Sequence, residues 1–101
     1  MKILWCWRCK MEVPMLNEIE YEEIHTLYGN AFTDPAWRGA PIADRFRPVC
    51  EKYREITGFD EPNHLAIMHH RISIFGEACG HCGKPLRTPQ AAFCAACGEP
   101  K

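Results

Sequence analysis

The stretch that decides the fold of the C-terminal part is Cys79–Gly98, "CGHCGKPLRTPQAAFCAACG". It holds two C-x2-C-G units, and a spacer of eleven residues separates Cys82 from Cys94. Two cysteines two residues apart on a tight turn direct both sulfurs at one point, and the glycine after them can adopt a positive φ. The spacer is long enough to run out and back as a hairpin. The pattern therefore predicts four thiolates around one tetrahedral metal ion, bound by Cys79, Cys82, Cys94 and Cys97.

This pair of turns resembles a zinc ribbon, and the resemblance covers about the last quarter of the chain. It implies a structural Zn²⁺ and a fold element, but no single activity, because zinc ribbons serve many partners. Residues 77–101 are dense in Gly, Pro and Cys and carry few large apolar side chains, so this tail cannot build a core of its own. Binding of the metal is expected to stabilise its folding by about 10 kcal/mol or more.

A third pair, Cys6 and Cys9, lies in the N-terminal stretch "WCWRC". The composition of residues 3–13, rich in Trp, Val and Ile, predicts an extended segment with this pair at a tight turn, and Pro14 is expected to end it. Haem attachment requires a histidine after the second cysteine, but Lys10 stands there. Thioredoxin-like proteins carry W-C-x-x-C between a strand and a helix; only five residues precede Cys6, and Pro14 interrupts any helix after it. Half of a second zinc site is therefore the leading interpretation, and a redox dithiol is the alternative.

The remaining ligands of that site must come from elsewhere in the chain. His69 is the first choice, because it shares a predicted helical stripe with Leu65 and Ile72 and points inward with them, whereas His70 is turned about 100° away. Alternatively, Cys6 and Cys9 could close a site with one of the tail pairs. The other candidate ligands are His25, His70 and Cys50, although Cys50 lies on an apolar stripe that favours a core thiol.

The middle of the chain has apolar residues at helical spacing. Asn17 and Glu20 have the three-residue spacing of a capping box at the start of the first helix, although Asn replaces the usual Ser or Thr. Pro48 is expected to kink or divide the second helix. The three predicted helices begin near Asn17, Pro41 and Pro62 and end near Gly29, Thr57 and Ile74 or Phe75. The predicted fold class is mainly α: a small three-helix domain with a C-terminal zinc ribbon and an N-terminal CxxC segment. Its parts are residues 1–14, 15–76 and 77–101, within one compact domain spanning residues 1–101.

The acidic side chains are unevenly placed. The formal net charge is -1, but no Lys or Arg occurs between Met11 and Asp34, where six acids lie. A bound zinc with four thiolates lowers the net charge by two, which disfavours nucleic-acid binding, and no basic and aromatic interleaving is visible along the sequence. The acidic side chains predicted to bind a partner with a basic surface are Glu18, Glu20, Glu22 and Glu23.

The sequence contains no P-loop, no G-x-S-x-G and no H-E-x-x-H motif, so no enzyme is predicted. Without a signal-peptide core or a long apolar run, the protein is expected in the cytoplasm. The expected function is therefore a small zinc-binding protein-interaction module, in one form a bacterial immunity or antitoxin-type protein that neutralises a basic toxin. A nucleic-acid- or translation-associated zinc ribbon is the second hypothesis, and a thiol redox or metal-dependent enzyme is the third.

Overall fold

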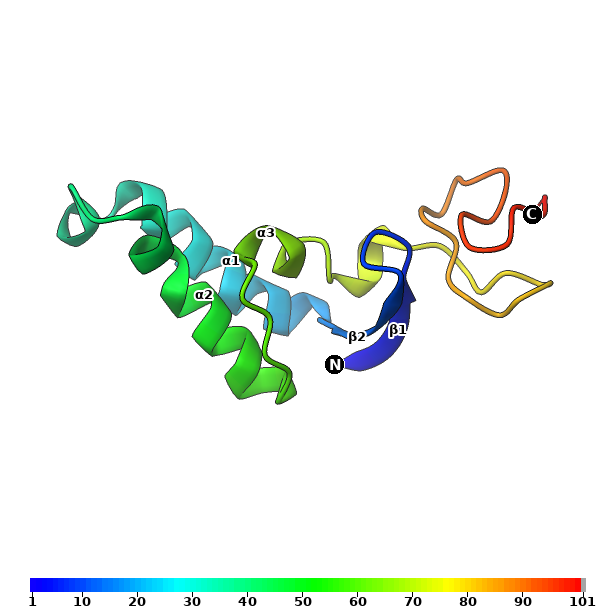
Figure 1. Ribbon diagram of the computed structural model, residues 1–101, viewed down its shortest axis with the longest axis horizontal. Coiled ribbons are helices and arrows are strands. Elements are labelled where there is room, and N and C mark those ends of the chain that lie inside the picture. Colours follow the sequence, from blue (N-terminus) through cyan, green and yellow to red (C-terminus); the bar gives the residue numbers. More distant parts are fainter. Residues whose placement is uncertain (101) are drawn as a thin grey trace.

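The computed structural model describes residues 1–100, of which three α-helices and a two-stranded antiparallel sheet are the main elements (Figure 1). Helical residues make up 42% of the chain, so the fold combines helices with a small sheet and with an irregular, cysteine-bearing tail. In chain order the elements are β1 (Lys2–Cys6), β2 (Met11–Met15), α1 (Glu18–Thr33), η1 (Pro35–Trp37), α2 (Ile42–Thr57), α3 (His64–Ile67) and η2 (Ile72–Ile74).

The N-terminal segment is extended, with the Cys pair at a turn, as predicted. Strands β1 and β2 pair in a hairpin in which Leu4 faces Val13 and Cys6 faces Met11. Pro14 was expected to end this segment, but it lies inside β2, and the strand continues to Met15. A proline is tolerated there because a two-stranded sheet consists of edge strands only.

Helix α1 begins with the predicted capping box. The side chain of Asn17 accepts from the amide of Glu20 at 2.9 Å, and the Glu20 carboxylate accepts from the amide of Asn17 at 2.9 Å. The predicted end at Gly29 is wrong, because the helix continues to Thr33. Packing beyond Gly29 explains the difference: Ala31 is buried there, and the Phe32 ring contacts the ring of Phe46 edge-on at 5.4 Å. This packing outweighs the cost of about 1 kcal/mol of a glycine inside a helix.

Helix α2 follows the prediction closely. It runs from Ile42 to Thr57 and ends at Gly58, whose φ of 75° allows its amide to bond the carbonyl of Arg54. Pro48 lies within one continuous helix, so of the two expected effects, a kink or a division, the division does not occur. Phe46, Val49 and Tyr53 form its buried face against α1, where they share a core with Ile24 and Ala31.

The third predicted helix is much shorter than expected. Only His64–Ile67 are α-helical, and the chain then becomes extended around Arg71 before the short turn η2. The reason is a competing set of backbone hydrogen bonds with Leu16: its amide donates to His70 O at 2.8 Å, and its carbonyl accepts from the amide of Ile72 at 2.9 Å. Residues after Ile67 therefore do not follow a helical period. As a result His70 is the fully buried histidine, not His69.

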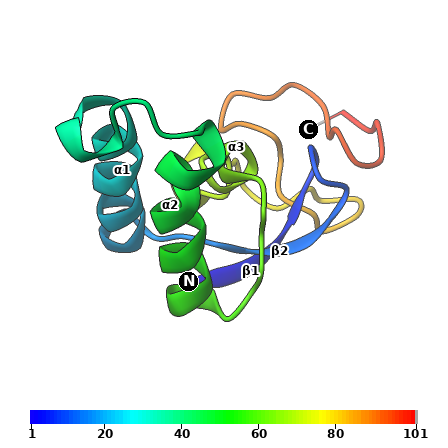
Figure 2. The same cartoon turned by 60° about the vertical axis from the view of Figure 1, so that its left-hand side comes forward.

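Three apolar clusters lie in series along a molecule of 49 × 23 × 21 Å. The helices form the first, the hairpin with Phe75 forms the second, and Leu86 with two cysteines forms the third. Figures 1 and 2 show the paths of the helices, the hairpin and the tail. The hairpin thus lies between the helices and the tail (Figure 1). In the described part of the chain, no helix combines the length and the apolar character that crossing a membrane requires.

The tail joins the rest of the molecule at Gly76. Its amide donates to Leu86 O at 2.8 Å, and the amide of Leu86 donates to Glu77 O at 2.9 Å. The chain approaches so closely here that a Cβ on Gly76 would lie 2.4 Å from the carbonyl oxygen of Thr88. Beyond this junction the tail has Leu86 as its one fully buried large apolar side chain among the described residues.

Candidate metal centres

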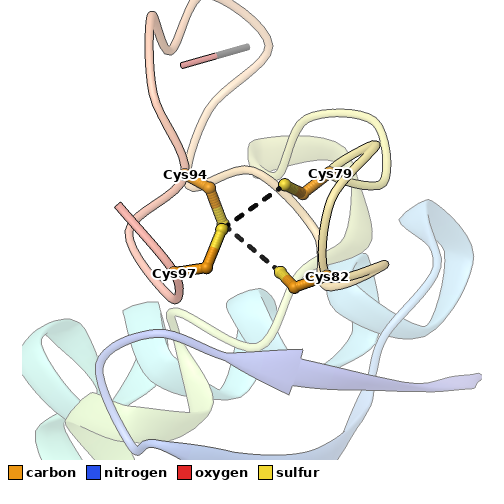
Figure 3. Close-up of side chains that lie close together, drawn as sticks. All are labelled: Cys79, Cys82, Cys94 and Cys97. Atoms are coloured by element: carbon orange, nitrogen blue, oxygen red, sulfur yellow. Dashed lines mark hydrogen bonds between the residues drawn. The ribbon is translucent and has the colours of Figure 1, made fainter. Parts of the chain in front are cut away.

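The four tail cysteines meet at one point, as the sequence predicts. Their sulfur atoms all lie within 4.8 Å of one another, and the four side chains converge from two separate turns (Figure 3). The Cys79 and Cys97 sulfurs are 3.8 Å apart, and the Cys82 and Cys94 sulfurs are 3.6 Å apart. Cys79 and Cys94 are buried, while Cys82 and Cys97 are exposed, so one side of the cluster is open to solvent.

These distances fit a tetrahedral ion rather than disulfides. A metal–sulfur bond of about 2.3 Å in a regular tetrahedron places two sulfurs about 3.8 Å apart. A disulfide requires about 2.05 Å between its sulfurs. The sulfur donors are therefore preorganised for one ion with four thiolate ligands.

The two tail turns have the same backbone geometry. Gly83 and Gly98 have φ angles of 77° and 79°, and each donates its amide to the carbonyl of the first cysteine of its pair at 2.8 Å. Inside each turn an amide also points at sulfur: His81 N lies 3.4 Å from Cys79 Sγ, and Ala96 N lies 3.4 Å from Cys94 Sγ. The positive φ predicted for these two glycines is thereby confirmed, and residues with a Cβ rarely adopt such values.

The turn amides also favour thiolates. Hydrogen bonds from the amides of Cys82 and His81 lower the pKa of Cys79, and bonds from the amides of Cys97 and Ala96 lower the pKa of Cys94 to about 7. At Cys97 the amide of Glu99 acts in the same direction, but partial desolvation and hydrogen bonds with the neighbouring thiols outweigh it and raise the pKa to about 12. The metal-free cluster therefore keeps protons that a metal ion must displace.

A second group of metal-binding side chains lies at the hairpin turn. Cys6, Cys9 and His70 have donor atoms within 4.8 Å of one another. Cys9 Sγ lies 3.4 Å from His70 Nε2, while Cys6 and His70 are fully buried. Burial lowers the pKa of His70 to about 4, assisted by the charge of His69, so the imidazole is neutral at pH 7. Burial also raises the pKa of Cys9 to about 11, and the charge of Cys6 adds to this.

In place of the predicted His69, the structure brings His70 next to Cys6 and Cys9. The helical period on which that choice rested ends at Ile67, and His70 instead occupies the position whose carbonyl bonds Leu16. His69 is half-buried and does not belong to the group. The tail cysteines form their own cluster, so the alternative pairing of Cys6 and Cys9 with a tail pair is not seen among the described residues.

The other candidate ligands, His25 and Cys50, and also His64 have structural contacts away from both groups. His25 stacks on Tyr21, and His64 lies parallel to the Phe46 ring with 3.9 Å between the centroids. The Cys50 thiol lies 3.7 Å from Pro62 O, and His81 is exposed between two ligands of the tail cluster. These environments fit packing and surface roles for the four residues.

Three of the four carboxylates predicted to bind a partner contact basic groups of the chain itself. Glu18 pairs with Arg71, Glu23 lies 3.5 Å from Lys52, and Glu20 lies 3.0 Å from the N-terminal amine in addition to its capping role. Glu22 is exposed on the same helix. The acidic face therefore carries less net charge than its sequence indicates.

A surface that the sequence did not reveal joins the hairpin to the tail, and we call it the aromatic–basic surface. Arg8 lies 4.6 Å from the centroid of Trp7, Arg87 lies 5.6 Å from the same ring, and Lys84 lies 4.5 Å from the centroid of Trp5. Trp7, Arg8 and Arg87 also line a cavity of about 350 Å³ with Ile74 and Thr88. The aromatic–basic surface consists of Trp5, Trp7, Arg8, Lys84, Arg87 and Phe93.

No protein family, no curated protein and no solved structure matches this chain. What the protein does must therefore be inferred from its two groups of metal-binding side chains and from its surfaces.

Proposed function

We propose that this protein is a small zinc-binding interaction module without an enzymatic activity of its own. The observation that carries the proposal is the convergence of Cys79, Cys82, Cys94 and Cys97 at sulfur separations that match a tetrahedral ion. Four thiolates fill all four positions of such an ion and leave none for a substrate, which is typical of structural zinc. Zinc would supply the tail with the stability that its small apolar cluster lacks.

The test of this proposal is the metal content of the reduced protein. Elemental analysis and native mass spectrometry should find zinc, and Cys94→Ser should bind one ion fewer than the parent. Cys50→Ser is the matched control, because Cys50 contacts Pro62 and should leave the metal content unchanged. An equal zinc content in Cys94→Ser and the parent would contradict the proposal. Iron in place of zinc would overturn the choice of metal, since a tetrahedral set of four thiolates accepts both.

The aromatic–basic surface supports a single-stranded nucleic acid as the partner. Aromatic rings on which bases can stack, next to Arg and Lys side chains that contact phosphates, are the combination used by proteins that bind single strands. Here the two kinds of side chain come from segments far apart in the sequence, because Trp7 and Arg8 lie at the hairpin turn and Arg87 lies in the tail. The folded tail would hold Arg87 next to Trp7 and Arg8. The zinc ion would therefore contribute to binding by keeping the tail folded.

Binding of labelled single-stranded RNA and DNA, followed by anisotropy, tests this partner. We expect binding at low salt that quenches tryptophan fluorescence and weakens steeply as salt increases. Trp7→Ala and Arg87→Ala should each weaken it, whereas Arg38→Ala, an exposed arginine outside the surface, should not. Absence of binding at low salt would exclude this partner.

A protein with a basic surface is the second candidate partner, as an immunity or antitoxin-type protein would require. The concentration of Glu18, Glu20, Glu22 and Glu23 at one end of α1 favours it. Exposed ion pairs contribute about 0–1 kcal/mol each, so a basic partner could replace those that Glu18 and Glu23 make within the chain.

Affinity capture from cells that express the protein at native levels separates these two partners. Recovery of one stoichiometric basic protein, lost in Glu22→Lys, would support the acidic face of α1. Recovery of RNA that is released by salt and lost in Arg87→Ala would instead support the aromatic–basic surface.

A further inference from the structure

The hairpin turn that carries Cys6 and Cys9 repeats the backbone geometry of the two tail turns. In each turn the residue after the second cysteine has a positive φ: 55° at Lys10, 77° at Gly83 and 79° at Gly98. The amide of this residue donates to the carbonyl of the first cysteine, at 2.7 Å for Lys10 and at 2.8 Å for the two glycines. Lys10 is the one residue other than glycine with a positive φ among residues 1–100.

The similarity extends to the sulfur atoms. An amide of each turn points at the first sulfur of its pair: the amide of Cys9 lies 3.5 Å from Cys6 Sγ, and the amides of His81 and Ala96 lie 3.4 Å from the sulfurs of Cys79 and Cys94. The turn is thus built as the tail turns are, although lysine replaces the glycine that made those turns recognisable in the sequence. A lysine held in this conformation indicates that the surrounding structure requires this turn.

His70 completes the donor set, and Tyr53 orients it. The imidazole lies with Nε2 3.4 Å from Cys9 Sγ and Nδ1 3.4 Å from the hydroxyl of Tyr53. That hydroxyl donates its own proton to Pro14 O, so its oxygen is available to accept from Nδ1–H. This arrangement selects the tautomer that leaves the Nε2 lone pair directed at the two sulfurs, as in histidines that bind metals.

From this geometry we propose that Cys6, Cys9 and His70 bind a second Zn²⁺ ion. Two thiolates and one imidazole suit zinc, and a tetrahedral ion with three protein ligands keeps its fourth position for water or a small exogenous ligand. The ion fastens the hairpin turn to the segment that follows α3, two parts of the chain about 60 residues apart. The second site does not require the tail cluster, so it can be present even if the tail binds no metal.

Zinc stoichiometry of the reduced, full-length protein tests the second site. We expect two ions in the parent, one in His70→Ala and two in His69→Ala, which is the matched control because His69 lies outside the group. Cys94→Ser, which removes a ligand of the tail cluster, should retain the second ion. One ion in the parent that is lost in Cys94→Ser would overturn the second site and leave the tail site standing. The same holds if His70→Ala keeps both ions.

Because His70 is buried, its replacement could disturb folding, and two milder variants avoid this problem. Tyr53→Phe removes the hydroxyl that orients His70 and should weaken the second site about 10- to 100-fold in competition with a chromophoric chelator. Lys10→Gly relieves the positive φ and should bind the second ion at least as tightly as the parent. Far-UV circular dichroism verifies that the helices are intact in both variants. Unchanged second-site affinity in Tyr53→Phe, or its loss in Lys10→Gly, would contradict the proposed geometry.

Discussion

At the scale of single residues, the backbone conformation and the space around a glycine determine whether another residue could replace it. Gly83 and Gly98 are required for a positive φ, and Gly76 for a close approach of the backbone. Gly29 lies inside a helix and meets neither requirement. At Gly76 the need is space, because the tail packs directly on its Cα. A side chain there must displace the backbone of Thr88.

Gly76→Ala is therefore expected to destabilise the tail. The added Cβ would lie 2.4 Å from Thr88 O and 3.0 Å from the Leu86 Cβ, and relief of such overlap costs about 1–3 kcal/mol. Urea denaturation of the metal-loaded protein measures the loss. Gly80→Ala is the matched control, because a Cβ at Gly80 meets no atom within 4 Å. Equal stability of the two variants would show that the tail can shift at Gly76 without cost.

The residue scale also shows what the sequence could predict about the site. Cys79, Cys82, Cys94 and Cys97 were predictable because each pair carries both ligands and the glycine of its turn within five residues. The metal-binding partner of Cys6 and Cys9 was not, because the position of His70 depends on backbone bonds to Leu16, 54 residues earlier in the chain. A local helical period cannot report such a long-range pairing.

At the scale of elements, the two long helices illustrate where local signals suffice. The capping box at Asn17 and the left-handed Gly58 are short-range features, and both boundaries were predicted from the sequence. Two predicted helix ends were wrong: the end of α1 at Gly29 and the extension of α3 beyond Ile67. At both places tertiary contacts override the conformation that the local sequence favours.

Asn17→Ala should destabilise the protein by about 0.5–2 kcal/mol, because it removes the side chain that caps the start of α1. The thermal midpoint of the helical circular dichroism signal measures this effect. The control is Asn30→Ala, which makes the same change at an exposed position within α1 and should leave the midpoint nearly unchanged or raise it. A similar loss in both variants would mean that the cap does not limit the stability of α1.

The ion pair between Glu18 and Arg71 links α1 to the extended segment before η2. Hydrogen bonds from Arg71 lower the pKa of Glu18 from 4.5 to about 2. A carboxyl whose pKa is lower in the folded state stabilises the fold above its unfolded pKa, and this contribution disappears as pH falls from about 4.5 to about 2. We therefore expect the Glu18 carboxyl to titrate in NMR spectra well below 4.5, and Arg71→Ala to return its pKa toward 4.5. Titration of Glu18 near 4.5 in the parent would show that the pair is not formed in solution.

At the scale of the whole molecule, the three apolar clusters are arranged in series rather than merged into one core. The chain has a radius of gyration of 15.3 Å, against about 13 Å for a compact domain of this length. Leu16 and Tyr53 connect the helices to the hairpin, while Gly76 and Leu86 connect the tail. The helices can therefore be stabilised by their apolar core while the tail depends on its metal ion.

Metal removal should consequently unfold the tail and spare the helices. A strong chelator under reducing conditions is expected to collapse the amide NMR resonances of residues 77–100 toward unfolded positions. The helical circular dichroism signal should persist, because the core of α1 and α2 contains no proposed metal ligand. Re-addition of zinc should restore the tail resonances. Loss of the helical signal in parallel with the tail would show that the clusters fold as one cooperative unit.

The separate position of Cys50 has a practical consequence for chemical labelling. Its thiol lies near Pro62 O, outside both groups of metal-binding side chains, and it is the one cysteine of seven that neither proposed zinc ion would shield. A maleimide should thus modify the zinc-loaded protein once, and all seven thiols only after chelation. Mass spectrometry of the adducts would count the protected thiols, and a fluorophore on α2 would then report how far the tail moves when the metal leaves.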